Sequence, residues 1–145
     1  MTKEIIVVAY ESDDDSKTVL AYAIDRASKS GAALHIVHVL EWSPYSFLTP
    51  QEVEERHGRR KQEMARAQEA ILTPALAQCT AAGVEATAEI RYGQVVELIL
   101  EITRAKGARM ICVGRSGSNS MASRVFGSVP LGLAQSAPVP TVIVP

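Results

Sequence analysis

Five short apolar runs, separated by segments with helical periodicity, constrain the fold of this chain more than any other feature. Most of the runs are rich in Val and Ile, which is typical of strands. They cover residues 5–10, 34–40, 84–91, 110–113 and 141–144. A regular alternation of strands and helices calls for right-handed crossovers, so the sequence predicts one α/β domain with a parallel sheet sandwiched by helices.

Four of the five runs are nearly continuous in apolar residues, as parallel strands covered on both faces are. The third run is different, because its apolar residues occupy every second position and charged or polar residues lie between them. These apolar residues are Val84, Ala86, Ala88 and Ile90. We therefore expect the third strand to lie at an edge of the sheet.

Helical segments are recognised from the spacing of their apolar residues and from their ends. One segment follows the i, i+3, i+4, i+7 rule from Val95 to Ile102, and Gly107 then provides a stop signal. The longest helix begins at Thr49, which can cap it, and Glu52 completes a capping box. Because proline cannot continue a helix in the usual way, we expect Pro74 to kink or restart this helix.

Length and charge limit the classes of function. The chain has 145 residues, 47% of them apolar, which suits a single domain over residues 1–145. Its net charge of −1 gives no general attraction for nucleic acid or an anionic membrane, so neither is an expected partner. The sequence starts without a signal-peptide pattern and holds no apolar stretch long enough to span a membrane, so we expect a cytoplasmic protein.

Cysteine and histidine spacing argues against a metal site. Cys79 and Cys112 lack the CxxC spacing of metal and redox sites, and we interpret both as reduced core thiols. His35 and His38 lie three residues apart in one predicted strand, so they point to opposite faces and cannot share a metal. We expect both histidines to serve packing, and we expect no metal ligands.

The segment after the fourth strand carries the candidate chemistry. Gly114 and Gly117 are followed, after nine intervening residues, by Gly127 and Ser128 at the start of the last helix. Glycines let the backbone turn tightly and present N–H groups to an anion, and a helix amino terminus adds donors and partial positive charge. A phosphate group is the ligand that such a site favours. Ser128 can offer its hydroxyl to a phosphate oxygen, and Arg115 can reach one.

This G-x2-G-x9-G-S pattern resembles that of the ATP-binding members of the universal stress protein family, and the resemblance spans essentially the whole chain. Further similarity lies in the first run followed by Glu11, in His38-Val39 near the end of the second run, and in residues 137–144. The family fold implies a flavodoxin-like, five-stranded parallel sheet in the order 3-2-1-4-5 with helices on both faces. That order would place the loops after strands one and four side by side at the switch point.

The resemblance also implies where an adenine nucleotide would bind. The family's base pocket falls on Ala9, Glu11 and Val39. Its phosphate and ribose contacts fall on Gly114, Gly117, Gly127, Ser128 and Val129. Relatives that bind ATP usually carry Asp where Glu11 stands. A carboxylate one methylene longer can still accept a hydrogen bond from an adenine amine or a ribose hydroxyl.

The function implied by the resemblance is that of an ATP-binding universal stress protein, a regulatory binding module in the stress response. Mg²⁺ can accompany the ATP, and a homodimer would form through the C-terminal strand, whose residues 141–144 are apolar enough for the edge to be covered. Two alternatives stay open: a slow Mg²⁺-dependent ATP hydrolase or phosphotransfer enzyme, and a nucleotide-free dimeric scaffold. No catalytic motif is evident, which argues against an enzyme.

Overall fold

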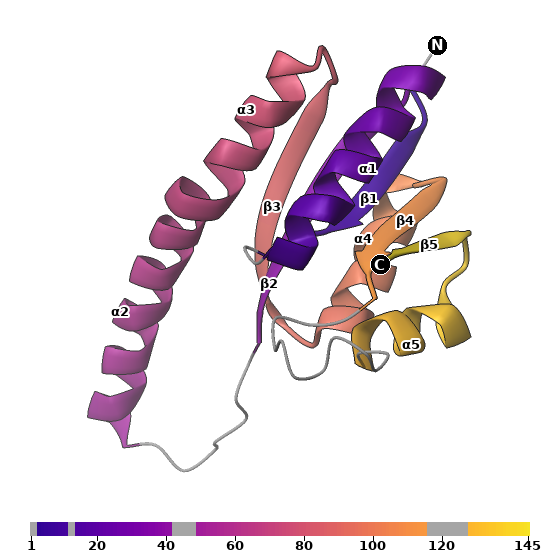
Figure 1. Cartoon of the computed structure of the whole chain (residues 1–145). Helices are drawn as coiled ribbons and strands as arrows, with labels where there is room; N and C mark the ends of the chain where they lie inside the picture. Colours follow the sequence, from indigo (N-terminus) through magenta and orange to yellow (C-terminus); the bar gives the residue numbers. More distant parts are fainter. Residues whose placement is uncertain (1–2, 12–13, 42–48, 116–127) are drawn as a thin grey trace.

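Five parallel strands form one sheet in the order β3-β2-β1-β4-β5 (Figure 1). The computed structural model describes residues 3–11, 14–41, 49–115 and 128–145. The strands are β1 (Ile5–Ala9), β2 (Ala33–Glu41), β3 (Ala86–Gly93), β4 (Met110–Gly114) and β5 (Thr141–Val144). The expected sheet order is confirmed, and so is the position of the third strand at an edge.

Helices cover both faces of the sheet, as predicted. The helical elements are α1 (Asp14–Ser30), α2 (Pro50–Ala67), the π-helical turn η1 (Gln68–Leu72), α3 (Thr73–Ala81), α4 (Val95–Lys106) and α5 (Ser128–Ser136). One apolar core lies between the sheet and α1, η1 and α3, and a second core lies between the sheet and α4 and α5. Figure 1 shows α2 continuing the line of α3 along one side and extending past the end of the sheet.

The start of the long helix follows its sequence signals. The hydroxyl oxygen of Thr49 accepts a hydrogen bond from the backbone N–H of Glu52 at 3.2 Å, and Pro50 occupies the first turn. The side-chain oxygen thereby satisfies one of the N–H groups that have no partner inside the helix. The predicted cap is confirmed.

The interruption of the long helix is also confirmed. Pro74 has no N–H, so the carbonyl of Ala70 lacks the donor that an α-helix would supply. The chain responds with the π-helical turn η1, in which the backbone N–H of Thr73 donates to the carbonyl of Gln68. The Thr73 hydroxyl donates to the same carbonyl at 2.9 Å, and α3 then begins.

The third strand begins and ends two residues later than its apolar run. The N–H of Val84 donates to the carbonyl of Cys79 at 2.9 Å, so it closes the end of α3 and does not enter the sheet ladder. At the other end, Gly93 pairs with Glu41 and prolongs the strand. The strand boundaries therefore depend on how the neighbouring elements use the backbone.

Candidate functional site

The carboxyl ends of β1 and β4 lie next to each other in the middle of the sheet. Val8 pairs with Cys112 in parallel register, so the chain leaves β1 after Ala9 and β4 after Gly114 on neighbouring paths. The strand order reverses here, because β2 follows on one side and β5 on the other. In open parallel sheets, ligands bind beyond such a switch point.

Backbone hydrogen bonds hold both segments that leave the switch point. The N–H of Tyr10 donates to the carbonyl of Val37 at 2.9 Å, and the N–H of Arg115 donates to the carbonyl of Val144 at 2.9 Å. Each bond continues a parallel ladder one residue beyond its strand. The sheet therefore fixes the positions from which the two loops start.

Three of the predicted nucleotide contacts pack against the same apolar core. Ala9, Val39 and Val129 come from β1, β2 and the first turn of α5, and all three are half-buried against the core on the α4–α5 face. Strand register explains part of this arrangement. Ala9 pairs with Val37, and Val39 lies two residues further along β2, so it points to the same side of the sheet.

The amino end of α5 supplies the polar part of the site. Ser128 is the first helical residue and is exposed. The first N–H groups of a helix have no partner within it, and the helix dipole adds partial positive charge there. Pro130, buried in the first turn, has no N–H and removes one donor. The helix end therefore has only a few amides for an anion.

Of the other residues predicted to contact the nucleotide, some lie in the part of the chain that the structure describes and some do not. Glu11 and Gly114 are half-buried at the ends of β1 and β4, and Arg115 is exposed beside Gly114. Gly117 and Gly127 lie outside the described residues, so their assignment stays a sequence prediction.

His38 lies directly behind the switch point, where the sequence predicted only packing. It is 8% exposed, and its Nδ1–H donates to the carbonyl oxygen of Tyr10 at 2.9 Å. Because a carbonyl oxygen only accepts, Nδ1 must carry the proton. The bond fixes the backbone between Ala9 and Glu11. The available signal was a polar residue in a buried strand, since such a residue requires a hydrogen-bond partner.

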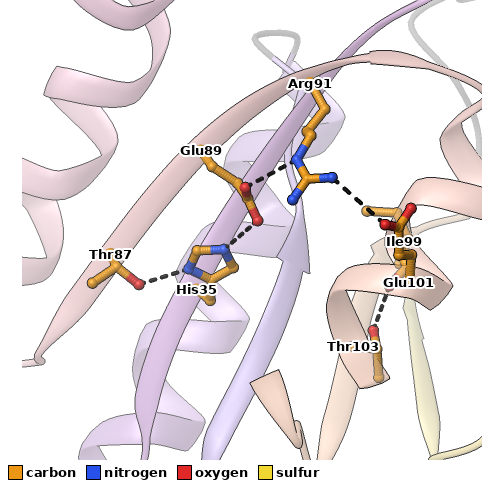
Figure 2. A network of polar contacts seen from close by, with 7 residues as sticks. All are labelled: His35, Thr87, Glu89, Arg91, Ile99, Glu101 and Thr103. Atoms are coloured by element: carbon orange, nitrogen blue, oxygen red, sulfur yellow. Dashed lines mark hydrogen bonds and ion pairs between the residues drawn. The ribbon is translucent and has the colours of Figure 1, made fainter. Parts of the chain in front are cut away.

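His35 points to the opposite face of β2, as its spacing from His38 predicted. Its Nδ1 lies 2.6 Å from the hydroxyl oxygen of Thr87, and its Nε2 lies 2.9 Å from a carboxylate oxygen of Glu89 (Figure 2). The second oxygen of Glu89 accepts from Nε of Arg91 at 3.2 Å. This network connects the edge strand β3 to β2.

The carboxylate of Glu89 stays ionised in this network. Burial acts to raise its pKa, but the hydrogen bond from His35 and the charge of Arg91 together outweigh burial and lower the pKa. An ionised carboxylate accepts only, so Nε2 of His35 carries a proton and donates to it.

The two cysteines are buried and free, as predicted. Burial raises the pKa of both thiols, that of Cys112 to about 11, so both are protonated at neutral pH and are poor nucleophiles. Within residues 3–11, 14–41, 49–115 and 128–145, no group of three or more His, Cys, Asp or Glu side chains is placed to hold a metal ion.

Fold and site together define a class of protein, the doubly wound α/β domains with a ligand position at the switch point of a 3-2-1-4-5 sheet. The sequence profile of the universal stress protein family matches residues 3–145. The chain therefore belongs to the universal stress protein family.

Solved structures of this family have the same fold. Universal stress protein UspA from Lactobacillus plantarum is 20% identical with a TM-score of 0.83, over 100% of this chain and 99% of its own. A universal stress protein in complex with cAMP is 23% identical with a TM-score of 0.70, over 100% and 98% of the two chains. One from Archaeoglobus fulgidus in complex with dAMP is 20% identical with a TM-score of 0.70, over 100% of both chains. Among curated protein sequences there is no match.

None of the helices in the described ranges combines the length and the apolar character needed to cross a bilayer.

Proposed function

We propose that this protein binds an adenine nucleotide, ATP, at the switch point and acts as a regulatory binding module in the stress response. The main support is that Ala9, Val39 and Val129 are half-buried and pack against the same apolar core on the α4–α5 face, with Ala9 at the end of β1 beside β4. Two relatives of the same fold were solved in complex with cAMP and with dAMP, and both ligands contain an adenine base.

The base would lie against the side chains of Ala9, Val39 and Val129. Ligand sites typically combine apolar walls, which cover the faces of a ring, with a few polar groups that orient it. Glu11 lies two residues after the end of β1 and is half-buried. Its carboxylate is the acceptor that an adenine amine or a ribose hydroxyl requires.

The phosphates would lie between the end of β4 and the start of α5. Gly114, Gly117 and Gly127 would supply backbone N–H groups, Ser128 a hydroxyl and Arg115 a charge. Three or four hydrogen bonds to phosphate contribute about 1.5–3 kcal/mol each, roughly 5–12 kcal/mol together. A micromolar site requires about 8 kcal/mol after the costs of association. Phosphate and base contacts are therefore both needed for tight binding.

Calorimetric titration with ATP, in Mg²⁺ and in EDTA, tests the proposal. Gly117→Asp places a carboxylate among the predicted phosphate contacts and is expected to weaken ATP binding about a hundredfold. Adenosine, which has no phosphate, should bind the wild type and this variant similarly. The matched control is Gly58→Asp in α2, because a Cβ at Gly58 meets no atom within 4 Å.

Two results would contradict the proposal: no heat from millimolar ATP with the wild type, or the same loss in Gly58→Asp as in Gly117→Asp. The first result would favour the nucleotide-free scaffold, and the second would mean that the loss does not come from the predicted phosphate contacts. Chromatography of the small molecules released from denatured protein gives a second readout. Mg²⁺-dependent phosphate release that falls in Gly117→Asp would instead favour a hydrolase.

We also propose that two copies pair through β5, which lies at an edge of the sheet. An edge strand presents unpaired N–H and C=O groups that a second copy can cover. Thr141, Val142 and Ile143 are half-buried, and Val142 and Ile143 are apolar. Sedimentation velocity at micromolar concentration should show a dimer, and a monomer would refute the pairing.

A further inference from the structure

An open cavity of about 350 Å³ lies between the carboxyl half of β2 and the long helix, where α2 passes into η1. Its apolar walls are formed by Leu40, Ala67, Ala70 and Ile71. Leu40 points to the face covered by α1 and α3, because it alternates with Val39 along β2. The cavity is therefore separate from the nucleotide contacts on the α4–α5 face. Its volume suits a small molecule, such as one aromatic ring with short substituents.

His38 gives the cavity a buried polar group. Its Nδ1–H is engaged by the carbonyl of Tyr10, so in the neutral ring Nε2 is an acceptor at the opposite edge. Within the described ranges, Nε2 has no hydrogen-bond partner, although His38 is only 8% exposed and lines the cavity. Because His38 lines the open cavity, Nε2 is available to accept a hydrogen bond from a donor on a ligand.

Two charged residues complete the cavity, and they are not equivalent. The carboxylate of Glu63 accepts a hydrogen bond from the hydroxyl of Tyr92 at 2.7 Å, which holds it on the β3 side of the cavity. Arg66 has no ion pair within the part of the chain that the structure describes. A guanidinium in this position favours a carboxylate on the ligand.

The π-helical turn lies in the wall of this cavity. Ala70 and Ile71 belong to η1, which exists because Pro74 cannot donate to the helix. π-helical turns are rare in proteins, but those that occur often lie at functional sites. Ala70 is also exposed, so a larger side chain there would fill the cavity without entering the core.

From this geometry we propose that the cavity binds a small phenolic carboxylate. The ring lies against Leu40 and Ile71, the phenol hydroxyl donates to Nε2 of His38, and the carboxylate pairs with Arg66. The ligand occupies the face of the sheet opposite the predicted nucleotide contacts.

Saturation-transfer NMR and calorimetry with 4-hydroxyphenylacetate test this proposal on the full chain. The hydroxylated probe should bind about tenfold more tightly than phenylacetate, which lacks the donor for His38, and more tightly than 4-methylphenol, which lacks the carboxylate for Arg66. Saturating ATP should leave the binding unchanged. The probe result is therefore independent of whether ATP binds.

Three variants assign the contacts. His38→Asn keeps an N–H for Tyr10 but removes the Nε2 acceptor, so it should bind the two acids about equally. Arg66→Met should weaken the two acids about tenfold and leave 4-methylphenol unchanged. Ala70→Leu should abolish binding by filling the cavity. Ala77→Leu, the same change at an exposed position of α3, should bind as the wild type does.

The proposal is overturned if none of the probes gives a signal at millimolar concentration, or if Ala70→Leu and Ala77→Leu bind alike. Equal affinity of the wild type for the two acids would also overturn it. Because Ala70 is exposed, its variant should fold even if His38→Asn does not.

Discussion

Replacing Glu89 with alanine tests the polar network that holds the edge strand β3 onto the sheet (Figure 2). The carboxylate accepts from Nε2 of His35 at 2.9 Å and from Nε of Arg91 at 3.2 Å. The side chain of His35 is 4% exposed, whereas that of Arg91 is 42% exposed. The two contacts therefore differ in what their loss costs.

The loss of unfolding free energy in Glu89→Ala follows from how deeply its two partners are buried. Without Glu89, the N–H of His35 has no partner and no access to water, which costs about 1–3 kcal/mol. Arg91 can turn to solvent, so its contact contributes about 0–1 kcal/mol. We expect the free energy of unfolding to fall by about 2 kcal/mol, which lowers Tm by roughly 6–8 °C for a chain of this size.

Urea and thermal unfolding, followed by circular dichroism, measure this change. Glu85→Ala is the matched control, because Glu85 lies 3.4 Å from Lys3 but both side chains are more than half exposed, at 65% and 54%. Such a pair contributes about 0–1 kcal/mol. If Glu89→Ala and Glu85→Ala lose the same stability, burial of His35 does not govern the cost and the reasoning fails.

The pH dependence has a defined sign. The pKa of Glu89 is lowered from its ordinary value of 4.5 in the folded protein. Its charge therefore stabilises the fold above that value, and this contribution is lost as pH falls through the lowered pKa. The stability difference between wild type and Glu89→Ala should be full at neutral pH and should shrink in this acidic range.

Three further predictions concern single groups. Thr141→Val should stabilise by about 1 kcal/mol, because the buried Thr141 hydroxyl has no hydrogen-bond partner among the described residues, whereas the same change at Thr87 should destabilise. Burial and the hydrogen bond to the Glu63 carboxylate raise the pKa of Tyr92 to about 12. The neutral phenol therefore stabilises the fold fully below pH 10, and this stabilisation is lost as pH rises through about 12. Ultraviolet titration of the tyrosines should show that the phase with the highest pKa is missing in Tyr92→Phe. Gly107→Ala should cost about 1 kcal/mol, because φ is 61° there, whereas Gly58→Ala inside α2 should stabilise, and urea unfolding compares the two.

Local sequence signals determined which elements form and where several of the helices begin and end. Thr49 and Pro74 act on the helix within one or two turns of their own positions. The helix start and the helix interruption can therefore be predicted without the rest of the chain. Gly107 ends α4 in the left-handed conformation for the same reason. Strand periodicity likewise predicted that His35 and His38 point to opposite faces of the sheet. The sheet order came from the family resemblance, and the structure agrees with it.

The candidate site was predictable only in part. The sequence pattern located the segment from Gly114 to Val129 and the resemblance added Ala9, Glu11 and Val39. Gly117 and Gly127 stay predictions. No periodicity indicated that the ring of His38 would hold the backbone of Tyr10.

Only the tertiary structure decided which distant residues meet. Ala9, Val39 and Val129 pack against one apolar core because parallel register aligns β1 with β2 and because α5 packs on that face. The pairing of His35 with Glu89 and the cavity beside η1 depend on the same register and on where the long helix lies. Such contacts join segments far apart in the chain, and a sequence pattern fixes which face a side chain takes but not which partner it finds across the sheet.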